Sequence, residues 1–240
     1  MSDTPNASPR LIRVWDPGVR IFHWLLVVAI ALAFLSSEEE SALWPWHIPI
    51  GWGAAMLIAF RLVWGFVGGE HARFANFIRP SQIGPHIRHL LSGKAAPSMG
   101  HNPLGALAVL ALLGLTAATI FTGVAGGEDA HEAIAYTLLG LVAVHVAAVL
   151  AMSHVGKDNL LLAMVTGKKH ADRYPDAHDA APPARLAVPV AALAVGAAAY
   201  GAVRIDPQAF APHAEAGEAG EREAGEHGGE NREGAERDDD

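Results

Sequence analysis

The sequence predicts an all-α integral membrane protein: a four-helix transmembrane bundle followed by a fifth transmembrane helix near the C-terminus. Hydrophobic residues make up 51% of the 240 residues. They are gathered into segments of about twenty residues, which is the helix length that crosses a bilayer. Tryptophans stand near the ends of the second segment, as expected for side chains at the membrane–water interface.

The first transmembrane helix is predicted over residues 17–36, after an N-terminal arm of residues 1–16. Asp16-Pro17 is the pattern of a helix N-cap followed by proline at the first helical position. A cleaved signal peptide is the alternative, because Ala31-Leu32-Ala33 resembles a cleavage site. The His23-Trp24 pair inside the apolar stretch argues against that alternative.

The second and third transmembrane helices are predicted over residues 46–67 and 103–124. The third contains no charged residue. Arg61 lies inside the second apolar segment, so it needs a partner there. The long loop between these helices, residues 68–102, is rich in arginine and histidine.

The fourth transmembrane helix, residues 131–154, carries a histidine at its start and another near its middle. His131 and His145 are 145 − 131 = 14 residues apart, so they lie on nearly the same helix face, roughly 21 Å apart along the axis. This spacing suits ligands for two separate cofactors. A single metal ion would need histidines about one turn apart.

The C-terminal region is predicted to contain a linker, a fifth helix and a disordered acidic tail. The linker covers residues 171–185, the helix residues 186–203 and the tail residues 204–240. The tail repeats glycine, glutamate and alanine with few apolar residues. Residues 205–240 hold twelve acidic residues against three arginines, a net of 3 − 12 = −9, while the whole chain carries −8.

The absence of cysteine restricts the cofactor chemistry. The chain cannot form disulfides, thiolate-ligated iron–sulfur clusters or covalently attached c-type haem. Any haem must therefore be bound non-covalently. We expect lipid around the bundle and no nucleic-acid partner.

The distribution of lysine and arginine predicts the orientation. The N-terminal arm, the 68–102 loop and the stretch after the fourth helix are basic, whereas the 36–45 and 126–130 loops contain neither residue. The positive-inside rule then places the N-terminus in the cytoplasm. With five spans, the acidic tail is periplasmic. If the fifth segment does not span the membrane, the tail is cytoplasmic instead.

Four histidines fall at two matching depths in this topology. His23 pairs with His145 toward the cytoplasmic side, and His47 pairs with His131 toward the periplasmic side. Any one of them alone could be a packing residue or a proton relay. Together they suit two b haems, because two axial histidines fill both open positions on the iron and favour electron transfer.

The porphyrin carboxylates of such haems require cations at the membrane interfaces. Arg20 and Arg61 lie toward the cytoplasmic side, so we expect them to bind the haem held by His23 and His145.

Several motifs resemble one known family. In order, they are Val14-Trp15-Asp16, Arg20-Ile21-Phe22-His23-Trp24, His47, Arg61-Leu62-Val63-Trp64-Gly65-Phe66, Gly100-His101-Asn102-Pro103-Leu104-Gly105, His131-Glu132, His145 and Met164-Val165-Thr166-Gly167-Lys168-Lys169. Their order and spacing over about residues 12–170 resemble the bacterial cytochrome b561 and nickel–iron hydrogenase cytochrome b family of di-haem membrane proteins. The resemblance implies a bacterial inner-membrane location and two b haems within residues 17–170. We add His101, in a matching motif, as a cofactor-binding candidate.

The resemblance also implies a function. We expect a transmembrane cytochrome b that passes electrons between the quinone pool and a redox partner, such as a periplasmic cytochrome c or a dehydrogenase subunit. The acidic tail would steer a cationic partner. Two alternatives stay open: a membrane-anchor cytochrome subunit of a hydrogenase or other dehydrogenase complex, and a haem-free membrane transporter.

Overall fold

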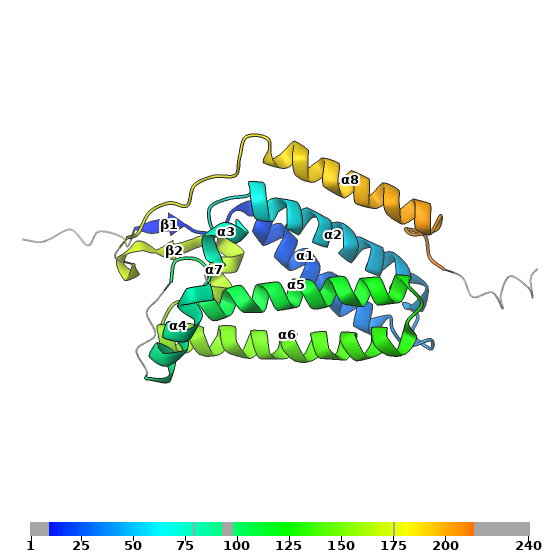
Figure 1. The fold of residues 1–240 in the computed structure, drawn as a ribbon, viewed down its shortest axis with the longest axis horizontal. Coiled ribbons are helices and arrows are strands. Elements are labelled where there is room, and N and C mark those ends of the chain that lie inside the picture. The colour runs from blue at the N-terminus through cyan, green and yellow to red at the C-terminus, as the bar shows by residue number, and fades with distance from the viewer. Residues whose placement is uncertain (1–9, 79, 93–97, 175, 214–240) are drawn as a thin grey trace, which may run out of the picture.

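The computed structural model describes residues 10–78, 80–92, 98–174 and 176–213. In this part of the chain, five helices are long and apolar enough to cross a membrane. They are α1 (Pro17–Leu35), α2 (His47–Val67), α5 (Pro103–Val124), α6 (Glu128–Gly156) and α8 (Ala187–Ile205) (Figure 1). The predicted all-α membrane fold is confirmed, and the protein is a multi-pass membrane protein. Most of the predicted acidic tail, residues 214–240, lies outside the described residues.

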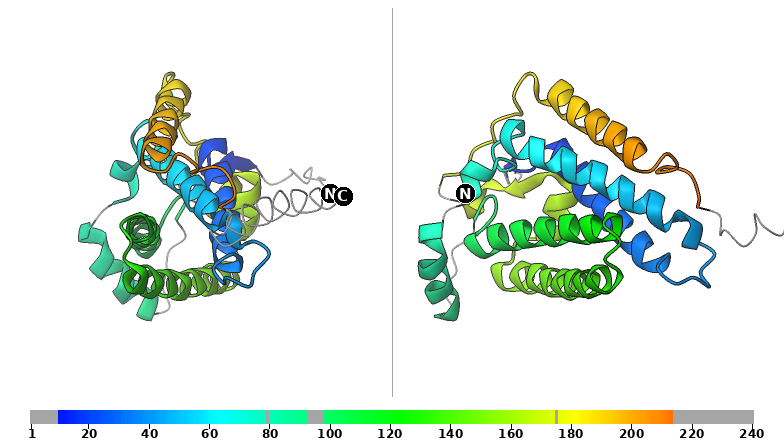
Figure 2. Two further views of the ribbon diagram at one scale, coloured as in Figure 1. Left: turned by 90° about the vertical axis from the view of Figure 1, so that its right-hand side faces the viewer. Right: turned by 45° about the vertical axis from the view of Figure 1, so that its right-hand side comes forward.

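The helices pack in a simple order. α2 contacts α1 and α5, and α5 runs alongside α6. α8 lies on the outside of the bundle against α2 (Figure 2). Large apolar side chains such as Phe66 and Leu193, each 74% exposed, point away from the interior. Such a surface suits lipid tails.

One end of the bundle carries a small cap that the sequence analysis did not predict. Two short strands, β1 (Leu11–Arg13) and β2 (Lys168–His170), pair antiparallel, with Ile12 opposite Lys169. Around them lie α7 (Leu160–Thr166) and η3 (Ala171–Arg173). We call this the capped end. The opposite end, with the connections 36–46 and 125–127, is the turn end.

The long loop predicted between the second and third spans also contains short helices. These are α3 (Phe74–Phe77), η2 (Pro80–Gln82) and α4 (Ile83–Leu91). At the turn end, η1 (Trp44–Trp46) leads directly into α2, and α6 begins three residues earlier than predicted.

Asp16 joins three segments at the capped end. Its carboxylate accepts hydrogen bonds from the Val19 amide (3.0 Å), the Trp64 indole N–H (2.9 Å) and the Gly69 amide (3.2 Å). The first bond caps α1, as the Asp16-Pro17 pattern predicts. The other two fix α2 and the chain after it to the start of α1.

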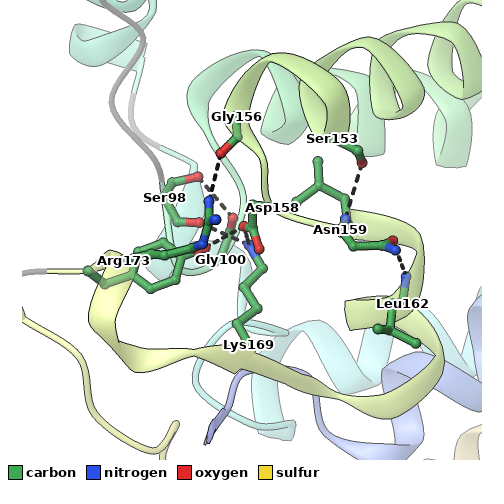
Figure 3. A network of polar contacts seen from close by, with 11 residues as sticks. Ser98, Gly100, Ser153, Gly156, Asp158, Asn159, Leu162, Lys169 and Arg173 are labelled. Atoms are coloured by element: carbon green, nitrogen blue, oxygen red, sulfur yellow. Dashed lines mark hydrogen bonds and ion pairs between the residues drawn. The ribbon is translucent and has the colours of Figure 1, made fainter. Parts of the chain in front are cut away.

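A buried lysine holds the cap to the loops beside it (Figure 3). Lys169 is 3% exposed. Its ammonium lies 3.0 Å from the Asp158 carboxylate and donates to the Ser98 carbonyl at 3.1 Å. Tyr174 donates a hydrogen bond to the same carboxylate. The loop that leads to α5 is thereby tied to the turn between α6 and α7.

A strap of residues 176–184 connects the cap to α8. Glu70 holds it by accepting from the Ala181 amide at 2.9 Å and contacting the His178 imidazole at 3.1 Å. The Ala180 amide donates to the Arg13 carbonyl at 2.8 Å, and the Ala184 amide donates to the Val67 carbonyl at 2.9 Å.

This strap is expected to loosen as the pH rises above neutrality. The Asp176 carbonyl and then the Glu70 carboxylate raise the pKa of His178 above its ordinary 6.5. Stabilisation by protonated His178 is therefore complete below about pH 6.5 and is lost as the pH rises through the raised pKa. The Ala181 amide lowers the pKa of Glu70 below its ordinary 4.5, so its contribution is lost only in acid. Hydrogen exchange at the Ala181 amide, corrected for intrinsic rate, should show less protection at pH 8 than at pH 6.

Glu70→Gln provides the control for this experiment, because an amide cannot carry the negative charge that attracts His178. The variant should show little difference in Ala181 protection between the two pH values. Equal protection at both pH values in the unmodified protein would contradict the proposed dependence.

Candidate haem-binding site

The structure brings His47 and His131 together at the turn end. His47 is the first residue of α2 and His131 lies in the first turn of α6. Their ring centroids are 6.0 Å apart, with the ring planes at 76°. Two imidazoles that bind one metal ion from opposite sides, each at about 2 Å, have centroids roughly 6 Å apart. The observed separation therefore fits two axial ligands.

Hydrogen bonds to main-chain carbonyls orient both rings. The Nδ1 atom of His47 lies 3.1 Å from the Ala33 carbonyl, and that of His131 lies 2.8 Å from the Thr119 carbonyl. A carbonyl can only accept, so Nδ1 is the donor in each ring. In a neutral imidazole this leaves the lone pair on Nε2, the arrangement usual for metal-binding histidines.

The helices around this pair explain why the carbonyls are available. Ala33 is in the last turn of α1, where carbonyls lack intrahelical partners, and it also accepts from the Ser36 hydroxyl at 3.1 Å. In α5, Gly123 allows the His131 ring to approach, because a Cβ there would lie 3.0 Å from Nδ1. Sequence reasoning placed the two histidines at one depth but gave no indication of these acceptors.

The second histidine pair lies in the half of the bundle nearer the capped end. His23 on α1 and His145 on α6 are within electrostatic range of each other. His23 Nδ1 is buried and has no hydrogen-bond partner among the described residues. This pair thus has the residue types of the first pair, but no carbonyl of the described residues orients the His23 ring through Nδ1.

The surroundings leave room for a planar group. Gly51 follows His47 by one turn and lies on nearly the same face of α2. A Cβ at Gly51 would meet nothing within 4 Å. Across the described residues, no group of three histidine or acidic side chains could hold a metal ion by itself. Pairs of histidines suit a metal whose other ligands come from a porphyrin, so the residues fit haem b.

Arg61 is a buried cation at the capped end. It is 3% exposed, and its guanidinium carbon lies 4.7 Å from the centroid of the Phe74 ring. No carboxylate of the described residues forms an ion pair with it. Arg20, one turn before His23, donates to the Val165 carbonyl, and its Nε atom is buried without a partner among those residues.

His101 lies beside these arginines, in a cluster that sequence reasoning recognised only in part. The ring centroid of Trp15 lies 4.8 Å from that of His101 and 6.1 Å from that of His71, and both pairs are edge to face. The ring centroids of Phe77 and His101 are 4.5 Å apart. His71 lies in the predicted 68–102 loop, where no periodic pattern marks a buried position.

Comparison with known proteins identifies the family of the chain. A family model described as prokaryotic cytochrome b561 matches residues 14–167, which is more than half of the chain and includes all four paired histidines. No curated protein and no solved structure shows significant similarity to the chain. The family match and the five membrane-spanning helices show that the chain belongs to the prokaryotic cytochrome b561 family and is a membrane-embedded cytochrome b.

Proposed function

We propose that this cytochrome carries two b haems and passes electrons across the membrane between the quinone pool and a redox partner. One haem is assigned to His23 and His145, the other to His47 and His131. The observation that carries the proposal is the 6.0 Å separation of the His47 and His131 rings, with both Nδ1 atoms tied to carbonyls.

Bound haem supplies one-electron chemistry, and the protein supplies ligands, charge and a dry environment. The histidines would hold the haems, and two histidine ligands for each iron would disfavour oxygen binding. Arg20, Arg61 and His101 would bind the haem nearer the capped end, since their buried nitrogens lack partners among the described residues. The apolar helix faces would exclude water from both sites.

The proposed orientation places the capped end in the cytoplasm of a bacterium, with the protein in the inner membrane. The described basic residues outside the five membrane-spanning helices lie in the segments of this end: Arg10, Arg13, Arg73, Arg88, Lys157, Lys168, Lys169, Arg173 and Arg185. The turn-end connections 36–46 and 125–127 contain no lysine or arginine. The positive-inside rule supports this assignment.

The same orientation suggests a cationic periplasmic partner, such as a cytochrome c or a dehydrogenase subunit. The Asp206 carboxylate accepts from the Trp52 indole at 3.2 Å, and the His213 amide donates to the Pro45 carbonyl at 2.9 Å. These contacts fix the start of the acidic tail at the turn end, near His47. Acidic charge there would attract a basic protein.

The haem content of the purified protein tests the function. A pyridine haemochrome assay, combined with a reduced-minus-oxidised absorption spectrum, is expected to give about two b haems per chain, since two axial histidines serve each haem. A colourless protein purified from cells with ample haem would overturn the proposal and favour a transporter.

A further inference from the structure

The capped end concentrates buried nitrogens that lack hydrogen-bond partners. Five of the six such side-chain atoms in the described residues lie there: Arg20 Nε, His23 Nδ1, Arg61 Nη1, His71 Nε2 and His101 Nδ1. Leaving a buried polar group unpaired is unfavourable, because the group has lost its hydrogen bonds to water. A cluster of them therefore points to a ligand that supplies acceptor atoms.

The two loop histidines are held in place around a common aromatic scaffold. Trp15 contacts the edges or faces of both rings, and Phe77 contacts His101. Gly100 also packs against His71, since a Cβ there would lie 2.7 Å from Nδ1. The rings are thereby fixed by packing, without a polar contact to either unpaired nitrogen.

Both histidines are neutral at physiological pH. Burial, followed by the positive charge of Arg61, lowers the pKa of His101 to about 3. Burial also lowers the pKa of His71, against the opposing effect of Glu70. A neutral imidazole carries one proton, which it can place on whichever nitrogen faces an acceptor. Each ring can thus donate one hydrogen bond.

The charge around the cluster selects an anionic acceptor. Arg61 is buried without an ion-pair partner among the described residues. Asp16 is within electrostatic range, but its oxygens already accept from Val19, Trp64 and Gly69. A buried guanidinium requires a compensating charge, and a carboxylate pairs with it better than a neutral carbonyl does.

The cluster also lies next to the second histidine pair. His101 is within electrostatic range of both Arg61 and His145. We propose that His71, His101 and Arg61 form a clamp, scaffolded by Trp15, that binds a carboxylate of the haem held by His23 and His145. This inference rests on the proposed function and adds His71 and Trp15 to it.

The test compares haem b with its dimethyl ester, which lacks both carboxylates. Apoprotein made in haem-deficient cells is titrated with each compound in a His47→Ala background, so that only the His23–His145 site is measured. The full-length protein is expected to bind haem b at least tenfold more tightly than the ester, because charged partners strengthen hydrogen bonds. His71→Leu should reduce this preference several-fold.

Two variants separate the clamp from a general loss of structure. His71→Gln retains an N–H donor and should keep most of the preference for the free carboxylates. His170→Asn removes an exposed imidazole from β2 in the same cap and should change nothing.

Binding of haem b and the ester with equal affinity would overturn the inference and leave the two-haem function intact. A His71→Leu protein that keeps the full preference for haem b over the ester would also overturn the inference. If this variant also binds a quinone analogue more weakly, the cluster would be assigned to a free quinone. Failure of the full-length protein to bind any haem would overturn the proposed function as well.

Discussion

Alanine in place of His131 should remove one of the two haems and leave the other spectrally unchanged. His131 and His47 face each other across 6.0 Å at the turn end, so loss of one ring leaves a single axial ligand for that haem. His145, the member of the second pair on α6, lies more than ten residues from His131. The second pair contains neither the His47 ring nor the His131 ring. His145→Ala should remove the other haem, and the double variant should contain neither.

The haemochrome assay measures this directly as a fall from about two haems per chain to about one, because each pair would serve one haem. His154→Ala is the matched control, since His154 is an exposed histidine on the same helix, nine residues beyond His145. Loss of both haems from either single variant, in a protein that still folds, would contradict two independent sites. Retention of both haems would contradict the ligand assignment.

The second large effect is expected at Asp16. Asp16→Ala removes the N-cap of α1, worth about 1 kcal/mol, and leaves the Trp64 indole and the Gly69 amide without their acceptor. Unpaired buried donors are each unfavourable by about 1–3 kcal/mol. We therefore expect the free energy of unfolding to fall by at least about 3 kcal/mol.

Denaturant unfolding in a fixed detergent, followed by tryptophan fluorescence, would measure the change. Asp179→Ala is the control, because Asp179 also accepts from a main-chain amide, that of Arg13, but its side chain is half exposed. Asp179→Ala should lower the free energy of unfolding much less than Asp16→Ala does, because water can replace the contacts of an exposed side chain. Equal losses for the two variants would show that Asp16 does not join α1 to α2 as described.

Sequence reasoning predicted the membrane helices well because their signal is length and hydropathy, which depend on the solvent rather than on neighbouring residues. The same reasoning placed the four histidines by depth, and the structure brings His47 close to His131. Iron ligation by these residues stays a prediction. The expected helix boundaries at Pro17 and Pro103 coincide with the structure, since proline marks both starts.

The cap was not predictable in this way. β1 and β2 have three residues each, too few for an alternating pattern to emerge. Lys169 looks like a surface cation in the sequence and is buried only because Asp158 and Ser98 come to it from other segments. The burial of His71 likewise depends on Trp15, which lies 56 residues earlier in the chain.

The carbonyls that orient His47 and His131 belong to the main chain, and this has an evolutionary consequence. A side-chain acceptor can be lost by a single substitution, whereas every amino acid at positions 33 and 119 still provides a carbonyl oxygen. These two hydrogen-bond acceptors are therefore protected against point mutation at the positions that provide them. Substitutions at positions 33 and 119 should be tolerated as long as α1 and α5 remain helical there.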